Sequence, residues 1–91
     1  MELKLKFDDE IIALSGQEFG NYIWETQIKQ YQNQPHITLV FPEQISCVTT
    51  SFGRGLLDAE IKKLGINSAK RKYTIQSNKK GFEKQFWDCW D

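Results

Sequence analysis

Hydrophobic and polar residues alternate at the start of the chain, where Leu3, Leu5 and Phe7 are separated by charged residues. This period of two is typical of a strand with one buried face. A charged turn at residues 8–10 leads into an apolar run at residues 11–14. The simplest prediction for this part of the chain is a β-hairpin.

The next segment shows helical spacing. Ser15 and Glu18 are three positions apart, as in a capping box, in which a hydroxyl and a carboxylate bind free backbone N–H groups at a helix start. We expect the first helix to run from Gly16 to about Gln32, because Pro35 disfavours helical geometry in the residue before it.

This helix carries apolar side chains on two sides. One stripe consists of Phe19, Tyr22, Ile23 and Thr26, and the other consists of Trp24, Ile28 and Tyr31. A single sheet cannot bury both stripes. Either one stripe meets another protein or the ends of the chain cover it, so the second stripe supplies candidate partner-binding residues.

Residues 36–41 form a continuous apolar and β-branched run, as expected for a central strand covered on both faces. A second helix fits residues 51–64 and is closed by Gly65, since left-handed geometry is usually needed at that position. Residues 66–70 are expected to form a polar connection.

The last third of the chain predicts one strand and one helix. Tyr73 and Ile75 alternate with polar residues, which indicates a strand with one solvated face. A turn at residues 78–81 and a short helix at residues 82–90 follow. The predicted order is β-β-α-β-α-β-α, an α/β fold in which helices pack on a small mixed sheet.

The final helix contains four aromatic side chains: Phe82, Phe86, Trp87 and Trp90. Tryptophan is enriched at protein interfaces, but in a small domain such residues more often close the edge of the core. We assign them to the core and keep an interface as the alternative.

Composition narrows the class of protein. The 91 residues are enough for one domain, over residues 1–91. Twelve basic residues balance twelve acidic ones, so the net charge gives no general attraction to nucleic acid or anionic membranes. No apolar stretch approaches the ~20 residues of a membrane helix. We expect a cytoplasmic protein that contacts no membrane and carries no cofactor.

The sequence contains no obvious catalytic group. His36 is the only histidine, which excludes a two-histidine metal site, and Cys47 lies among apolar residues, as inert buried thiols do. Residues 53–55 lack the spacing of a phosphate loop and are expected to pack closely on the sheet. Asp58 and Glu60 fall on different sides of their helix. We predict that the protein is not an enzyme.

Three adjacent hydroxyl residues, Thr49, Thr50 and Ser51, stand at the start of the second helix. Hydroxyls at this position can cap the helix, bind an anion or accept a phosphate. The residues alone leave two interpretations open, a plain helix cap and a phosphate-controlled docking point.

Residues 15–76 resemble STAS-like domains, the relatives of anti-sigma factor antagonists and of the cytoplasmic domain of sulphate transporters. The most specific part is residues 39–41 followed by residues 45–52, which resembles the family pattern of a strand, a short loop and a helix start with Thr or Ser, Ser and Phe. Two positions differ from that pattern. Val40 replaces a common acidic residue, and Thr49 replaces the Asp before the phosphorylated serine.

The resemblance implies a regulatory partner switch. In such a switch the domain docks on an ATP-binding serine kinase of the histidine-kinase-like ATPase superfamily, and phosphorylation at the helix start separates the two proteins. By position the phosphate acceptor is Thr50, with Ser51 and Thr49 as neighbouring candidates. The candidate partner-binding residues around it are Gln44, Ser46, Thr50, Phe52 and Arg54.

Two alternatives belong to other classes. A basic run consists of Lys62, Lys63, Lys70, Arg71, Lys72, Lys79 and Lys80. It predicts either a solvated face or a nucleic-acid-binding accessory protein. The other alternative is a structural subunit that forms oligomers through Trp24, Ile28 and Tyr31.

Overall fold

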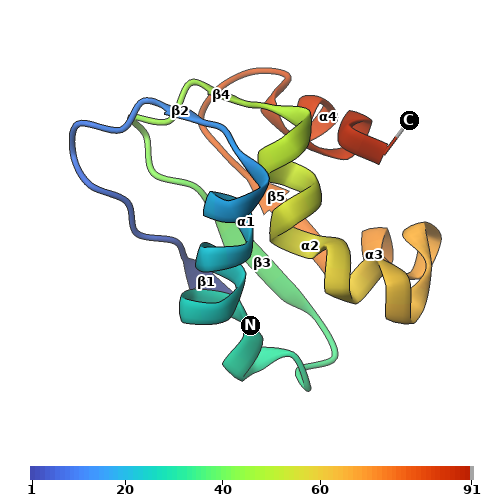
Figure 1. The fold of residues 1–91 in the computed structure, drawn as a ribbon. Coiled ribbons are helices and arrows are strands. Elements are labelled where there is room, and N and C mark those ends of the chain that lie inside the picture. Colours follow the sequence, from blue (N-terminus) through green and yellow to red (C-terminus); the bar gives the residue numbers. More distant parts are fainter. Residues whose placement is uncertain (91) are drawn as a thin grey trace.

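A parallel sheet of three strands forms one layer of the fold in a computed structural model, which describes residues 1–90 (Figure 1). The strands are β1 (Glu2–Lys4), β3 (Ile37–Val40) and β5 (Tyr73–Gln76), in the order β1-β3-β5. All strand pairs within residues 1–90 are parallel, so the α/β class is confirmed and the predicted mixed sheet is wrong.

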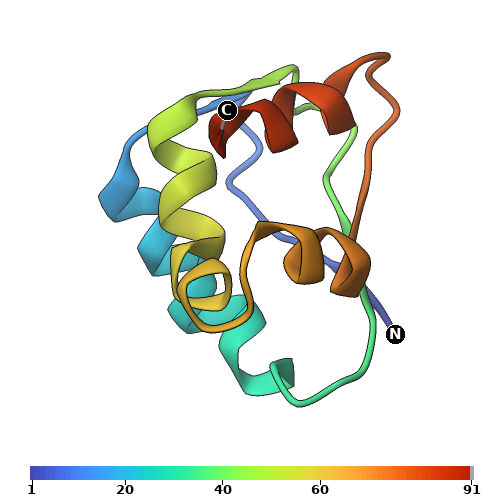
Figure 2. The same ribbon diagram turned by 90° about the vertical axis from the view of Figure 1, so that its right-hand side faces the viewer.

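The helices lie together on one face of this sheet (Figure 2). The register places Leu3, Leu39 and Ile75 side by side, and Leu39 and Ile75 are buried under the helices. On the opposite face Thr74 and Gln76 are exposed. The central position of β3 is confirmed, but its second face, at Thr38 and Val40, is only half-buried, so the expectation that both faces are covered is wrong.

A second, two-stranded sheet replaces the predicted hairpin. It pairs β2 (Ala13–Leu14) with β4 (Cys47–Val48), while β1 pairs with β3 in the main sheet. These pairings bury Leu5 and Leu14 in one core. An isolated hairpin is at best marginally stable in water, so the distant partners are favoured over the neighbouring strand.

The first helical region covers the predicted span but changes type twice. It consists of α1 (Gln17–Ile23), a π-helix, η1 (Trp24–Ile28), and a 3-10 turn, η2 (Lys29–Tyr31). The predicted capping box does not form. The residue before α1 is Gly16, with a φ of 92°, and no side chain caps the helix there.

The longest helix, α2 (Thr50–Leu64), crosses α1 at very short distance. A Cβ atom on Gly20 would lie 2.3 Å from the carbonyl oxygen of Phe52, and one on Gly55 would lie 2.2 Å from that of Gln17. Only glycine permits this backbone contact. Gly55 therefore packs on α1, whereas a Cβ on Gly53 would lie 2.5 Å from Cys89 Sγ, so residues 53–55 do not pack on the sheet as expected.

The C-terminal half contains a helix where the sequence predicts a polar connection. Gly65, with a φ of 85°, follows the last residue of α2 and closes the helix, as predicted. Residues 66–70, however, belong to α3 (Ile66–Lys72). Lysine, arginine and alanine favour helix, and Ala69 gives this helix a buried contact.

The chain then passes through β5 to α4 (Phe82–Trp87) and a 3-10 turn, η3 (Asp88–Trp90), as predicted. Phe82 and Phe86 are fully buried, and Trp87 and Trp90 pack against the core, which confirms the core assignment. No helix within residues 1–90 is both long and apolar enough to cross a membrane.

Candidate functional site

The loop before α2 is held by side chains predicted to bind a partner. Gln44 Nε2 donates a hydrogen bond to the carbonyl of Asp8 at 3.0 Å, and Ser46 Oγ donates to the carbonyl of Ile12 at 3.0 Å. These contacts fasten residues 8–12 against the loop. Ser46 remains exposed at its surface, whereas Gln44 is half-buried.

Two of the three hydroxyls fix the start of α2. Thr49 is the N-cap, and its Oγ1 accepts a hydrogen bond from the N–H of Phe52 at 3.3 Å. Ser51 Oγ lies 3.2 Å from Thr49 Oγ1 and accepts a hydrogen bond from the N–H of Gly16 at 3.2 Å. Thr49 therefore caps α2, and Ser51 ties this helix to the start of α1.

Thr50 is different from its neighbours. It is the first residue of α2, its side chain is exposed, and its hydroxyl makes no hydrogen bond to residues 1–90. Arg54 lies one helical turn further along the same exposed side, where its Nε donates to the carbonyl of Cys89 at 2.7 Å. The exposed hydroxyl of Thr50 and the guanidinium of Arg54, which is held at Cys89, are thus four residues apart at the N-terminal end of α2.

Phe52 is not available to a partner. Its side chain is fully buried, and its ring packs against Phe7 and Phe19. The prediction that Phe52 binds a partner is therefore wrong. Successive residues of a helix point in different directions, so Ser51 faces solvent while Phe52 faces the core.

The predicted oligomer contact is also in the core. Trp24 and Ile28 are buried and Tyr31 packs against the same cluster. The reason is that α2 covers one side of the first helical region while the sheet lies under another (Figure 1). A subunit contact through Trp24 and Ile28 would need the domain to open.

The basic run does not form one continuous patch. Lys62 pairs with Asp58 at 3.0 Å, and Lys72 pairs with the buried carboxylate of Glu60 at 2.7 Å. Residues 70–72 precede β5 and residues 79–80 follow it, so the two groups lie at opposite ends of that strand. This separation removes the continuous positive stripe on which the nucleic-acid alternative was based.

A buried polar cluster around Glu60 was not predicted. Glu60 is only 1% exposed, and its Oε2 accepts a hydrogen bond from the hydroxyl of Tyr73 at 2.6 Å. Lys72 Nζ also donates to the carbonyl of Gln32 at 2.5 Å. Burial, and then the hydrogen bond and charge of Glu60, raise the pKa of Tyr73. The cluster joins three segments that are distant in sequence, which is a structural role.

Helical spacing could have revealed Glu60. It follows Gly53, Leu56 and Leu57 at i+7, i+4 and i+3, and all three of those residues are buried. Asp58 instead pairs with Lys62 near the surface. As predicted, the two carboxylates do not face each other.

The histidine and the cysteines do not meet. His36 Nδ1 lies 3.1 Å from the carbonyl of Arg71, and its Nε2 lies 2.9 Å from Thr74 Oγ1. Cys47 is half-buried rather than buried, and Cys89 is the buried thiol, whose pKa is raised by desolvation. A Cys–His pair between His36 and Cys47 is therefore absent from the described residues.

Comparison with protein-family models, with curated proteins and with solved structures finds no match to this chain. The STAS-like resemblance therefore stays a prediction.

Proposed function

We propose that the protein is a non-enzymatic regulatory module that docks on another protein through its helix-start surface, defined as residues 44–50 and the first turn of α2. The partner is a histidine-kinase-like ATPase that phosphorylates Thr50. The observation that carries the proposal is the exposed, unengaged hydroxyl of Thr50 between two neighbours whose hydroxyls are engaged.

The position of Thr50 favours a phosphate. Phosphorylation adds about −1.5 to −2 charges at neutral pH, and a helix N-terminus stabilises an anion through its dipole and its free amides. Arg54, one turn along α2, supplies a cation on the same side. Because Thr49 and Ser51 hold the backbone, the phosphate changes the charge of the surface without loosening the helix start.

The reaction would be carried out by the partner. The hydroxyl oxygen of Thr50 attacks the γ-phosphorus of ATP, the bond from that phosphorus to the β-γ bridging oxygen breaks, and ADP leaves. The hydroxyl proton passes to a base of the kinase. This chain supplies the acceptor and the docking surface, which is the division of labour that the STAS-like resemblance implies.

The first experiment is mass spectrometry of the protein purified from its native host together with whatever binds it. We expect a phosphate on the peptide that contains Thr50, and its loss in Thr50→Ala. A co-purified ATPase that leaves Thr50 unphosphorylated after incubation of the isolated complex with ATP would contradict the proposal.

The second experiment measures affinity for the co-purified partner. We expect Thr50→Glu to weaken binding by roughly tenfold or more. A carboxylate on a docking surface is repelled by like charges of the partner, and removing water from it costs free energy. Ala59→Glu is the matched control, since Ala59 is exposed on the same helix far from its first turn. Equal affinities for wild type and Thr50→Glu would exclude Thr50 as the switch.

A further inference from the structure

The C-terminal turn, η3, is fastened to the first turn of α2. The Nε of Arg54 donates a hydrogen bond to the carbonyl of Cys89 at 2.7 Å, and the thiol of Cys89 lies 3.6 Å from the carbonyl oxygen of Thr49. A Cβ atom on Gly53 would lie 2.5 Å from Cys89 Sγ, so this approach depends on a glycine. The turn therefore packs directly beside the start of α2, where Thr50 is the first residue.

Helical geometry brings the side chain of Arg54 past Thr50. At 3.6 residues per turn, successive residues are about 100° apart around the axis, so Thr50 lies between Gly53 and Arg54 when α2 is viewed end on. The turn packs against Gly53, and Arg54 reaches it from the other side of Thr50. Helical side chains also lean toward the N-terminus of their helix. The guanidinium of Arg54 is therefore held over the strip of helix surface on which Thr50 stands.

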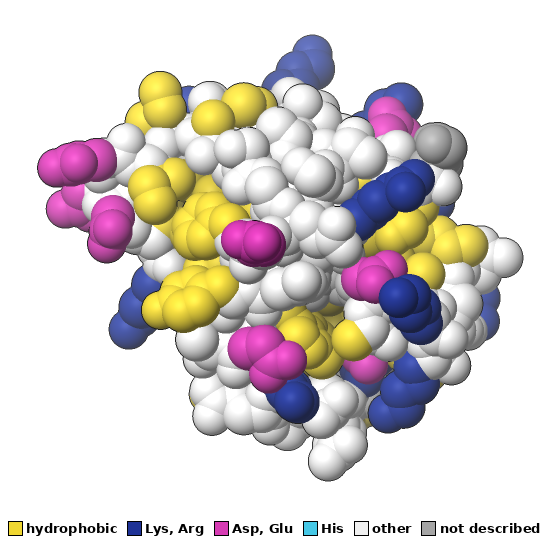
Figure 3. Space-filling model, viewed as in Figure 1, with side chains coloured by type: hydrophobic (Ala, Val, Ile, Leu, Met, Phe, Trp, Pro, Cys, Tyr) yellow, Lys and Arg dark blue, Asp and Glu magenta, His cyan; other side chains and the backbone are white. Residues whose placement is uncertain are grey.

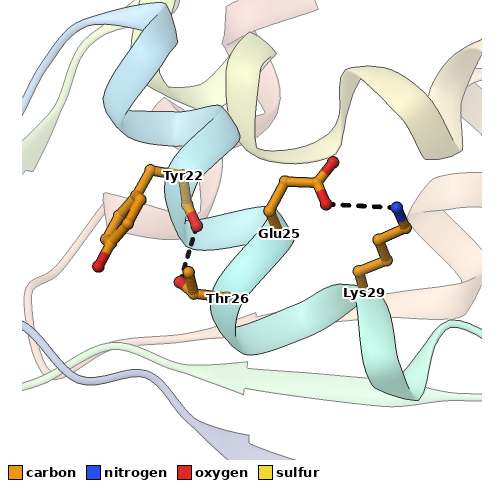
Figure 4. Close-up of polar contacts among 4 residues, drawn as sticks. All are labelled: Tyr22, Glu25, Thr26 and Lys29. Atoms are coloured by element: carbon orange, nitrogen blue, oxygen red, sulfur yellow. Dashed lines mark hydrogen bonds and ion pairs between the residues drawn. The ribbon is translucent and has the colours of Figure 1, made fainter.

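A spacing of four residues already brings side chains together elsewhere in this chain. Lys29 Nζ pairs with Glu25 at 3.3 Å across one helical turn (Figure 4). Residues at this spacing are neighbours on a helix surface. Thr50 and Arg54 have the same spacing, so a phosphate on the first would meet the guanidinium of the second.

Arg54 is the only charged residue in the loop before α2 and in the first two turns of the helix. The carboxylates on either side of it have lysine partners, because Asp58 pairs with Lys62 at 3.0 Å and Asp88 pairs with Lys84 at 2.8 Å. On the face drawn in Figure 3, acidic and basic side chains are interspersed, so no large patch of one sign dominates the field. The two Nη groups of Arg54 have no partner within residues 1–90.

We propose that Arg54, positioned by the carbonyl of Cys89, receives the phosphate of Thr50, so that phosphorylation fastens the C-terminal turn more firmly to α2. The inference rests on the proposed function for the modification itself. The Nε stays on Cys89, and the two Nη groups form the paired hydrogen bonds that a guanidinium makes with a phosphate. The modification thereby also takes the one cation of this region away from a partner.

The first test uses the whole chain with phosphothreonine built in at residue 50, so that no kinase is needed. Phosphorus NMR follows the titration of the phosphate with pH. We expect Arg54→Gln to raise the midpoint by about 0.5 pH units or more, because a neighbouring cation favours the dianion. Arg54→Lys should restore only part of the difference, since an ammonium lacks the planar fork.

Two further variants separate position from charge. Arg71→Gln removes the other arginine of the chain, at an exposed site outside α2, and should leave the midpoint unchanged. Gly53→Ala keeps Arg54 but pushes the C-terminal turn away, and should raise the midpoint as Arg54→Gln does.

The second readout is the thiol of Cys89, which is buried in the turn, with the thiol of Cys47 on β4 as the reference in the same molecule. Local opening of the turn exposes Cys89 to a thiol reagent. The phosphate should slow the reaction of Cys89 relative to Cys47 by roughly threefold or more, because it adds a charge-assisted contact that holds the turn. Arg54→Gln should cancel this slowing.

Two results would overturn the inference. One is an equal midpoint in the phosphorylated wild type and Arg54→Gln, and the other is faster reaction of Cys89 after phosphorylation, which would mean that Arg54 leaves Cys89 to reach the phosphate. Either result leaves Thr50 as the acceptor. Absence of the phosphate from the native protein would instead refute the proposed function, because the phosphate measured here is introduced by synthesis.

Discussion

Two adjacent threonines of identical chemistry have different roles at the start of α2. Thr49 caps the helix through its hydroxyl, and Thr50 is exposed with an unengaged hydroxyl. The sequence shows that hydroxyls meet a helix start here, but it places that start at Ser51. The helix begins at Thr50, and a shift of one residue decides which hydroxyl is the cap.

The difference can be measured by urea unfolding. Thr49→Ala should lower the free energy of unfolding by about 1 kcal/mol, since an orphan N–H loses its acceptor. Thr50→Ala should change it by less than about 0.5 kcal/mol, as substitutions of exposed side chains usually do. Equal losses in the two variants would contradict the assigned cap.

The buried carboxylate of Glu60 should matter far more than its exposed neighbour. Glu60→Ala leaves the ammonium of Lys72 without its partner in the interior and should lower the free energy of unfolding by about 3–5 kcal/mol. Asp58→Ala removes only an exposed pair with Lys62 and should lower it by less than about 1 kcal/mol. Chemical denaturation of both variants tests this ranking, which a small loss in Glu60→Ala would refute.

We expect the protein to lose stability in alkali because of Tyr73. Its pKa is raised above the ordinary value of 10.0, so above that pH the unfolded chain releases the proton while the folded chain retains it. The contribution is complete below pH 10 and declines as the pH rises further. Unfolding measured on both sides of that pH should show a steeper decline for wild type than for Tyr73→Phe, and parallel curves would show that Tyr73 is not responsible.

Among the helices and strands, those defined by a local pattern were predicted correctly, whereas the pairings between distant segments were not. The periods of β5 and of α4 depend on neighbouring residues, and both elements form as expected. The hairpin failed because Leu14 finds its partner on β4, far along the chain. Glycines in helices indicated close packing, but only the fold shows that α1 is the partner of α2.

The crossing of α1 and α2 should be intolerant of one methyl group. Gly20→Ala and Gly55→Ala each push a Cβ into backbone atoms and should lower the free energy of unfolding by about 1–3 kcal/mol or more. Asn21→Ala is the control, because Asn21 is exposed on the same helix. Melting temperatures of the three variants test this, and an unchanged Gly20→Ala would show that the helices lie further apart.

Across the whole molecule, the segment between β1 and α1 holds the helix-start surface in place. The carbonyl of Asp8 accepts a hydrogen bond from Gln44, and the N–H of Gly16 donates one to Ser51 at the helix start. The sequence could supply the hydroxyls of this surface. It could not supply these contacts, because they depend on the parallel pairing of β2 with β4, which are distant in the sequence.

We propose that the helix-start surface docks on a kinase-like partner under the control of Thr50. Its most direct test is a photo-crosslinking amino acid placed at Glu43, exposed beside that surface, and in a second variant at Asn67, exposed on α3, both produced in the native host. We predict an adduct with an ATPase from position 43 only, lost when Thr50→Glu is added. An adduct that forms equally from both positions, or that persists with Thr50→Glu, would contradict the claim.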